Sequence, residues 1–512
     1  MSGKLVRRSL LTFAKLPLCL ANNLSKPASS RRQKACALVR NSCLLALLAL
    51  VVCGLGSGAS ARAEVPYGTF IYDLSGREIP VQPAYVPETF FHGGLKNPED
   101  LFIDAKDRLF VADTGNNRIV QMDLRGETRR VIQPEGAGKL NEPGGVFVSP
   151  DGTIYVADTK NKRIAVFDET GGFLRSIGRP QAPMIPPDFV FEPTKLVVDE
   201  RGYMYVATRN GYQGLLLLDQ DGAFEGFFGA NKVDFQMSDA LKRVFFTKEQ
   251  MQKELLKLPG TVSNVTAGPD GLLYTTSMKV TRGQIKKLNY DGKDLLGEQN
   301  YGVRRLLAGQ QKQFTDVAVD SLGNMTAVDA LFGLLFQYNS AGELMFAFGS
   351  KDEGYGKLGL FQYPSALAVD SAGTLYVLDR TAHMIQTFKR TEFGALVQKA
   401  TDLHLQGHYD ESAGPWREVL HLNSKYVRAH LGLAKSYYKN GEYAEAMRAF
   451  REGGDTGGYS DAFWQLRLLW MQRHFTQMAA IGAVVLLIAF AGWKLKTKRA
   501  RRKDGERIES AA

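Results

Sequence analysis

VFVSPDGTIYVADTKNKRIAVFDETG (Val146–Gly171) and LFIDAKDRLFVADTGNNRIVQMDLRG (Leu101–Gly126) are two copies of one sequence unit. Each copy has an apolar strand, a polar turn, a second strand ending in VAD, another polar turn and a third strand ending in Asp. Apolar and polar residues alternate within these strands, which is the period of β-structure. The unit therefore predicts three short strands joined by tight turns.

Four weaker copies of the unit follow, beginning at Leu196, Val265, Val317 and Leu367. Repeats of roughly 40–50 residues built from short strands are typical of a β-propeller, in which each repeat is one blade. One blade cannot bury both of its faces alone, and closing the ring removes the exposed sheet edge. We therefore predict a mainly β fold, a six-bladed β-propeller over residues 64–392.

A further fragment of the unit precedes the first copy. Phe70–Gly76 (FIYDLSG) matches the third strand of a repeat, as in Val166–Gly171, but no first or second strand comes before it. A strand from the N-terminal side that joined the last blade would tie the two ends of the ring together. We expect Phe70–Gly76 to join that blade after Phe388.

The copies resemble the NHL-repeat family. The match covers about Pro66 to Lys389, and it is best at VADTGNNRI and VADTKNKRI in the first two blades. The resemblance implies a six-bladed propeller. Bacterial NHL proteins of this layout look like accessory surface proteins, and by analogy one could work beside a carbohydrate uptake system.

The net charge of +11 comes from the two ends of the chain. Residues 1–63 hold ten Lys and Arg and no acidic residue, and residues 494–512 hold eight basic and three acidic residues. The part between them holds 46 basic and 50 acidic residues, a balance of −4. Nucleic-acid binding domains are basic, so the sequence predicts no nucleic-acid partner.

Residues 1–63 have the pattern of an export signal. Four basic residues between positions 31 and 40 precede the uncharged apolar stretch Cys43–Leu55, and Ala61–Ala63 forms a small-x-small cleavage site. An uncleaved signal anchor is the alternative. All four cysteines lie in this leader, so disulfides and thiolate metal sites are excluded from the remaining body.

A second uncharged apolar run, Phe475–Trp493, predicts a transmembrane helix. Its 19 residues would span about 28 Å, close to the thickness of a bilayer core. Seven Lys and Arg follow within residues 494–503, and the positive-inside rule places the tail 494–512 in the cytoplasm. We predict a single-pass protein of the cell membrane whose large N-terminal domain is extracellular. The tail could also bind anionic lipids.

Residues 393–474 change to helical spacing and match themselves at an offset of 34 residues. Gly407 aligns with Gly441 and Tyr409 with Tyr443, in LHLQGHYDES and YYKNGEYAEA. A 34-residue helix–turn–helix unit with Gly at the turn resembles a tetratricopeptide repeat. Each Gly is expected to end a helix in a left-handed cap. The segment is either a rigid stalk or a docking site for a protein partner.

In a propeller the innermost strand of each blade starts near the central channel, so the residue before each inner apolar run should line the channel mouth. These residues are Asp100, Gly145, Lys195, Asn264, Asp316 and Ala366.

Asp100, Asn264 and Asp316 could hold a hard cation or a polyol, because oxygen ligands suit Ca²⁺. Glu99 lies one residue away and could add an oxygen. The arrangement is similar in type to that of the calcium-dependent lactonase propellers, which use Glu, Asn and Asp at the channel. The alternative is a mouth closed by a salt bridge from Lys195, which would neutralise the site.

The aspartates of the VAD segments are interpreted as structural, because Asp at such a turn commonly accepts bonds from neighbouring backbone amides. Only His92 and His383 fall within the propeller. Two histidines cannot supply the zinc ligands of the amidating-lyase branch of the NHL family.

An insertion between the third and fourth repeats, Asn231–Gly260, predicts an amphipathic helix on the channel-mouth face. Phe245, Phe246 and Met251 could form a lid or an apolar rim there. Alternatively, the helix merely packs on the two blades beside it.

Three functions remain open from the sequence. The first is a membrane-anchored extracellular recognition module that binds a protein or a carbohydrate-like ligand at the channel mouth, without catalysis or a required cofactor. The second is a calcium-dependent lactonase- or lyase-type enzyme, which would need an ion or a base at Asp100, Asn264 and Asp316. The third is an assembly scaffold that acts through the helical repeats.

Overall fold

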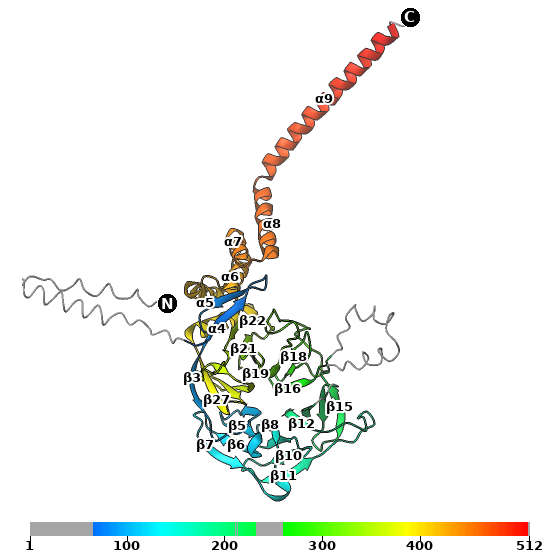
Figure 1. Cartoon of the computed structure of the whole chain (residues 1–512). Coiled ribbons are helices and arrows are strands. Elements are labelled where there is room, and N and C mark those ends of the chain that lie inside the picture. The colour runs from blue at the N-terminus through cyan, green and yellow to red at the C-terminus, as the bar shows by residue number, and fades with distance from the viewer. Residues whose placement is uncertain (1–64, 210, 212, 232–259, 510–512) are drawn as a thin grey trace, which may run out of the picture. The chain divides into compact units, whose positions relative to one another are not determined.

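The computed structural model describes residues 65–209, 211, 213–231 and 260–509 (Figure 1). The predicted leader, residues 1–63, lies outside these ranges. So does the predicted helix of the insertion, together with Phe245, Phe246 and Met251. Within the described ranges the chain forms a ring of β-sheets and then a series of helices, in the predicted order.

Six antiparallel blades make the ring. The first three blades contain β4 (Asp100–Ile103), β5 (Leu109–Asp113), β6 (Arg118–Met122) and β7 (Thr128–Ile132); β8 (Pro143–Val148), β9 (Ile154–Asp158), β10 (Arg163–Phe167) and β11 (Phe173–Ile177); and β12 (Pro193–Val198), β13 (Met204–Thr208), β14 (Leu215–Leu218) and β15 (Phe224–Phe228). The last three contain β16 (Val262–Ala267), β17 (Leu273–Ser277) and β18 (Ile285–Leu288); β19 (Phe314–Val319), β20 (Met325–Asp329), β21 (Leu334–Tyr338) and β22 (Leu344–Phe348); and β25 (Pro364–Val369), β26 (Leu375–Asp379) and β27 (Met384–Arg390). Of the smaller elements, the 3-10 helix η1 (Thr114–Asn116) joins β5 to β6 within the first blade, and η2 (Gly136–Gly138) lies between the first two blades. A small parallel pair, β23 (Ser350–Lys351) with β24 (Leu360–Phe361), lies between the last two.

The innermost strands close the ring. Neighbouring strands contact one another in the cycle β4, β8, β12, β16, β19, β25 and back to β4 (Figure 1). Hydroxyl groups bind between blades: Thr114 and Thr159 donate to the carbonyl oxygens of the next blade's Pro143 and Pro193, each at 2.7 Å. The six-bladed propeller is therefore confirmed.

The strand that ties the ends of the ring is not the predicted one. Phe70 lies in β1 (Thr69–Tyr72), which pairs with β22 at the outer edge of the fifth blade. The hairpin partner of β1 is β2 (Glu78–Val81), and the next strand, β3 (Tyr85–Phe91), pairs with β27 and completes the sixth blade.

Packing around Tyr85, the first residue of β3, holds this strand against the fifth blade and α4. Tyr85 is 1 % exposed, stacks on Phe348 with ring centroids 5.1 Å apart, and accepts hydrogen bonds from Gln337 and Gln398. The prediction for Phe70–Gly76 was wrong because the place beside β27 is taken by β3, whose backbone pairs with it from Tyr85 to Phe91.

The aspartates that end the second strands are structural, as predicted. Asp113 and Asp158 are fully buried and accept backbone N–H bonds at 2.7 and 2.8 Å from Lys96 and Asn141 in the segments that lead into the inner strands. Each also binds an arginine of its own hairpin. Asp329 and Asp379 likewise accept backbone amides.

The described helices are α4 (Glu392–Leu405), α5 (Tyr409–Leu422), α6 (Val427–Lys439), α7 (Tyr443–Glu452), α8 (Thr456–Arg473) and α9 (Phe475–Glu509). Gly407 and Gly441 follow α4 and α6 with φ of 85° and 77°, so both predicted left-handed caps are confirmed. Beyond these caps, the tetratricopeptide resemblance stays a prediction.

The first helices pack on the propeller and share its core. Phe393, Trp416 and Tyr426 cluster with Phe346 and Phe348 of β22. The Tyr426 hydroxyl donates to the Met345 carbonyl at 3.1 Å. Burial of these aromatic rings makes α4–α6 an integral part of the fold.

α9 holds the predicted membrane segment. Its residues Phe475–Arg499 form a helix that is long and apolar enough to cross a bilayer, and none of its most apolar stretch is buried by the rest of the chain. This is compatible with a single-pass membrane protein.

Candidate ligand site at the channel mouth

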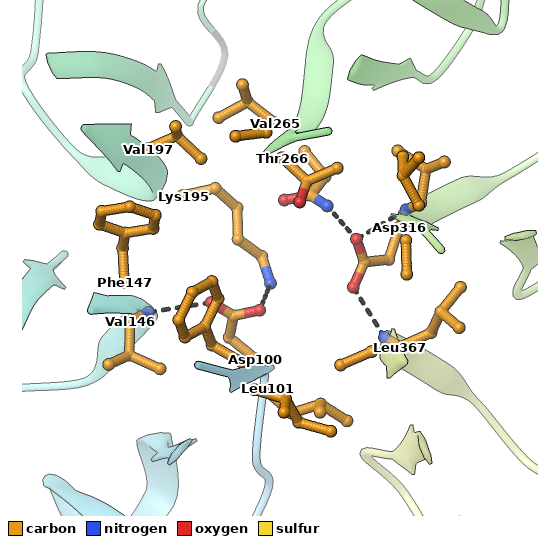
Figure 2. Close-up of a pocket in the computed structure, with 18 of the residues that line it drawn as sticks. Asp100, Leu101, Val146, Phe147, Lys195, Val197, Val265, Thr266, Asp316 and Leu367 are labelled. Atoms are coloured by element: carbon orange, nitrogen blue, oxygen red, sulfur yellow. Dashed lines mark hydrogen bonds and ion pairs between the residues drawn. The ribbon is translucent and has the colours of Figure 1, made fainter. Parts of the chain in front are cut away.

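The six predicted mouth residues occupy one equivalent position in the six blades. Each is paired with the penultimate residue of the VAD-type strand, as in Asp100 with Ala112 and Lys195 with Ala207. The remaining pairs are Gly145 with Ala157, Asn264 with Thr276, Asp316 with Val328, and Ala366 with Leu378. The structure thus brings Asp100, Lys195, Asn264 and Asp316 to the lining of a single cavity (Figure 2).

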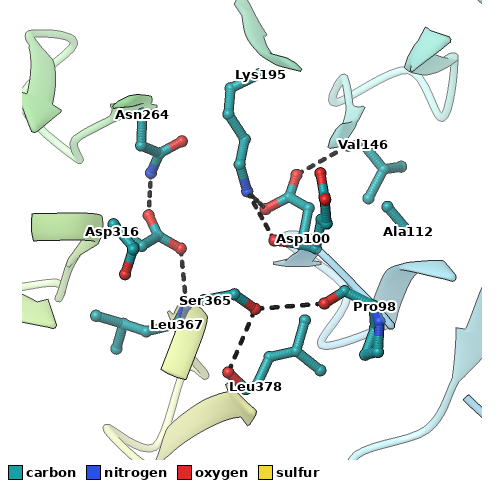
Figure 3. A network of polar contacts seen from close by, with 12 residues as sticks. Pro98, Asp100, Ala112, Val146, Lys195, Asn264, Asp316, Ser365, Leu367 and Leu378 are labelled. Atoms are coloured by element: carbon teal, nitrogen blue, oxygen red, sulfur yellow. Dashed lines mark hydrogen bonds and ion pairs between the residues drawn. The ribbon is translucent and has the colours of Figure 1, made fainter. Parts of the chain in front are cut away.

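Asp100 connects the first three blades. Its carboxylate accepts a backbone bond from Val146 of β8 at 2.9 Å and binds the ammonium group of Lys195 on β12 (Figure 3). Both charged residues are 7 % exposed. A buried ion pair is stable only when further hydrogen bonds satisfy its atoms, and the Val146 amide supplies one.

Asp316 connects the last three blades in the same way. One carboxylate oxygen accepts hydrogen bonds from the side-chain amide of Asn264 on β16 and from the backbone N–H of Val317. The other oxygen accepts a hydrogen bond from the backbone N–H of Leu367 on β25 at 2.7 Å. Its main side-chain partner is therefore an uncharged amide. Burial raises the pKa of Asp316 from 3.8 to about 7, while the charge of Lys195 lowers this pKa and that of Asp100 raises it.

Gly145 makes room for the first of these networks. A Cβ atom there would lie 2.5 Å from the Thr194 carbonyl oxygen and 3.2 Å from the Asp100 carboxylate. The backbone of β8 could not then approach Asp100 as closely. The glycine at this position of the ring is therefore a requirement of the polar network.

A second ring of side chains also lines the cavity and was missed by the sequence analysis. It consists of the residues two positions beyond the mouth residues: Phe102, Phe147, Val197, Thr266, Ala318 and Ala368. Phe102 and Phe147 contact each other with centroids 5.2 Å apart. The period-two alternation could have located this ring, because residues i and i+2 share one face of a strand. The cavity they line has a volume of about 220 Å³.

Glu99 does not join the other predicted residues. Its carboxylate binds Arg380 at 3.1 Å, and only its backbone carbonyl approaches Lys195, at 3.4 Å. Within the described ranges no three His, Cys, Asp or Glu side chains gather as metal ligands do. A calcium ion at this position would have to displace Lys195 from Asp100, and the calcium hypothesis stays a prediction.

The comparisons with known proteins concern the propeller. The NHL repeat family model matches residues 140–167, in the second blade. Similar solved structures include a streptogramin B lyase (14% identity, 60% of this chain and 98% of that one, TM-score 0.39) and a catalytically inactive virginiamycin B lyase from Staphylococcus aureus with quinupristin (11%, 63% and 88%, TM-score 0.37). A Bacteroides thetaiotaomicron structural-genomics protein of unknown function is also similar (12%, 57% and 69%, TM-score 0.39).

No curated protein matches the chain. At these identities and TM-scores, no property of these proteins is carried over to this chain. The chain is a six-bladed β-propeller with one stretch that matches the NHL repeat model, followed by helices of which one is long and apolar enough to span a membrane.

Proposed function

We propose that this protein is a membrane-anchored recognition module whose propeller binds a carbohydrate-like ligand, or a side chain of a protein partner, at the channel mouth. The observation that carries the proposal is the cavity of about 220 Å³ whose lining includes a carboxylate–ammonium pair and a carboxylate–amide pair. Ligand sites usually combine an apolar lining with a few convergent polar groups.

The polar groups of the mouth are held in place before any ligand arrives. Asp100 and Asp316 are each bound by groups from neighbouring blades, so their side chains have little freedom to lose. Preorganised groups favour binding because less conformational entropy is lost on association.

The size and lining of the cavity favour a small ligand. Pockets for drug-sized ligands start at about 300 Å³, and this cavity is smaller. Phe102 and Phe147 line it together with the polar ring. A single sugar ring offers hydroxyl groups to the mouth and C–H faces to these aromatic rings.

The membrane anchor supports action at a cell surface. Phe475–Arg499 provides the span, and the basic residues 494–503 follow its apolar part. Under the positive-inside rule the tail is cytoplasmic and the propeller extracellular. Protease treatment of intact cells tests this arrangement: the propeller should be digested and an epitope on residues 494–512 protected.

Binding at the channel is tested with the full-length protein in detergent. A panel of neutral mono- and disaccharides is screened for a rise in melting temperature, since a ligand that binds only the native state must raise it. Ala318→Leu fills the cavity and should abolish any such rise, while Ala318→Ser is the matched control. A ligand that stabilises the leucine variant equally would place its site elsewhere.

The enzyme alternative is favoured by one observation. Asp316 has a pKa of about 7 and lines a cavity, which is typical of a general acid or base. Its three hydrogen bonds leave it little freedom to reach a substrate. Lactone hydrolysis by the wild type that Asp316→Asn abolishes would establish this alternative in place of simple recognition.

The scaffold alternative is favoured by a larger hollow of about 930 Å³ beside the helices. The β1–β2 hairpin lines one side of it, and the start of α6 with the end of α7 lines the other. Deleting residues 400–474 would expose the propeller core at Phe346 and so cannot test this role. Leu74→Asp, at a side chain 59 % exposed in the hollow, is a milder test: loss of co-purifying membrane proteins would support scaffolding.

A further inference from the structure

Helix α8 has two halves with different surroundings. Its first part packs on α7: Ala462 is fully buried with Ala446 and Phe450, and Asp455 caps the helix by accepting the Gly458 N–H at 3.0 Å. From position 463 to Arg473 every side chain is exposed or only partly buried. The helix therefore begins on the protein and continues away from its core.

Large apolar side chains cover the second half. Phe463, Trp464, Leu469 and Trp470 are each about half exposed, at 51, 53, 49 and 55 %. Single exposed apolar side chains are normal on a protein surface, but four large ones within eight residues indicate a covering partner. Of the four tryptophans in the chain only Trp416 is buried, and the other three flank the apolar run 475–493.

The distribution of these side chains around the helix indicates what covers them. Successive residues of a helix turn by about 100°, so Phe463, Trp464 and Leu469 point in three different directions. A partner helix would cover one direction only. Arg467 and Arg473 lie among them, and the Arg467 guanidinium stacks over Trp464 at 5.5 Å. A helix with apolar and cationic side chains on all sides is suited neither to full immersion in water nor to the hydrocarbon core of a bilayer.

We propose that the second half of α8, residues 463–473, is embedded in the headgroup layer of the bilayer that α9 crosses. Tryptophan is enriched in this layer, and arginine can bind lipid phosphates there. The inference rests on the proposed membrane span, with which α8 is nearly continuous, since only His474 separates the two helices.

The break at His474 makes this position geometrically possible. The eleven residues are about 16 Å long as a helix, whereas each headgroup layer is only about 5–8 Å thick. The segment stays in the layer only if it is strongly tilted from the membrane normal. His474 has φ of −105° and ψ of 8°, outside the helical region, so α8 and α9 can take different directions.

The test uses the full-length protein in phosphatidylcholine vesicles, with tryptophan quenching by lipids brominated near the headgroup. In the wild type Trp464, Trp470 and Trp493 should be quenched. The double variant Trp464→Phe/Trp470→Phe should lose about two-thirds of the lipid-dependent quenching, if the three contribute equally. As a control, Tyr355→Trp on the propeller, where the side chain is 68 % exposed, should add emission that brominated lipid does not quench.

Two results would overturn the proposal. Quenching equal in the wild type and the double variant, with emission of Trp464 and Trp470 at long wavelength, would show that water surrounds α8. Emission at short wavelength without quenching by lipid would show that a protein, either a second copy or another membrane protein, covers it. In both cases, lipid quenching that persists in the double variant but is lost when Trp493→Phe is added would show that the membrane span itself is intact.

Discussion

Asp100 and Asp316 occupy the same position in two blades, yet the two carboxyl groups have different side-chain partners. Asp100 faces the ammonium group of Lys195, and Asp316 faces the amide of Asn264. Each also accepts a backbone N–H from the following blade, Val146 or Leu367. One half is thus held by an ion pair and the other by hydrogen bonds to a carboxyl group that titrates near neutral pH.

The largest effect is expected from breaking the charged half. Lys195→Ala leaves the Asp100 carboxylate buried without its counter-charge, and such a loss destabilises a protein by about 3–5 kcal/mol. Chemical denaturation in detergent measures it. The double variant Asp100→Asn/Lys195→Met should recover most of the loss. If Lys195→Ala destabilises the protein no more than Arg77→Ala, at an exposed ion pair, then Lys195 does not stabilise the buried Asp100 carboxylate.

The Asp316 carboxyl group should make the stability of the protein depend on pH. The pKa of Asp316 is higher in the folded protein, about 7, than its ordinary 3.8, so the folded state holds the proton more tightly. The stabilisation is complete below about pH 4 and is lost as the pH rises to about 7, by at most roughly 4 kcal/mol.

Asp316→Asn removes this titration. It also costs stability at every pH, because an amide cannot accept all three bonds that the carboxylate accepts. The difference in unfolding free energy between the wild type and the variant should therefore shrink between pH 4 and 7. A difference that is constant over this range would mean that Asp316 is ionised throughout.

Gly145 and Ala366, which occupy the equivalent position in two blades, provide a matched pair of variants. Gly145→Ala places a Cβ 2.5 Å from the Thr194 carbonyl oxygen and should destabilise the protein by about 1–3 kcal/mol, as overpacking does. Ala366 already carries a Cβ at the equivalent position, so Ala366→Gly should cost only about 1 kcal/mol. Equal losses in thermal unfolding would contradict the steric account of Gly145.

The smallest effect is expected from calcium. Because Lys195 already neutralises Asp100, calcium and EDTA should leave the melting temperature of the wild type unchanged. Calcium should stabilise Lys195→Ala, in which Asp100 is free. A calcium-dependent rise in the wild type would restore the metal hypothesis.

The repeat and its period-two alternation were enough to predict the propeller, its blade number and the equivalent positions of the six ring residues, because these features are local to each repeat. Contacts between repeats were not predictable. Pro87 interrupts the alternation in β3, so the strand that completes the sixth blade was overlooked. Glu99 turns toward Arg380, far away in the sequence, and the backbone amides that hold Asp316 come from its own strand and from the next blade.

The helical segment had a weaker local signal. Gly407 and Gly441 located its turns, but nothing in the spacing indicated that Tyr426 would share a core with Phe346 of the propeller. Such packing depends on surface shape, which a single sequence does not display.

Binding inside the channel is tested most directly by comparing Ala318→Leu with Ala318→Ser against a saccharide that stabilises the wild type. We expect the stabilisation to be lost in the leucine variant, which fills the cavity, and kept in the serine variant. Equal stabilisation of both variants would contradict a ligand site between Asp100 and Asp316.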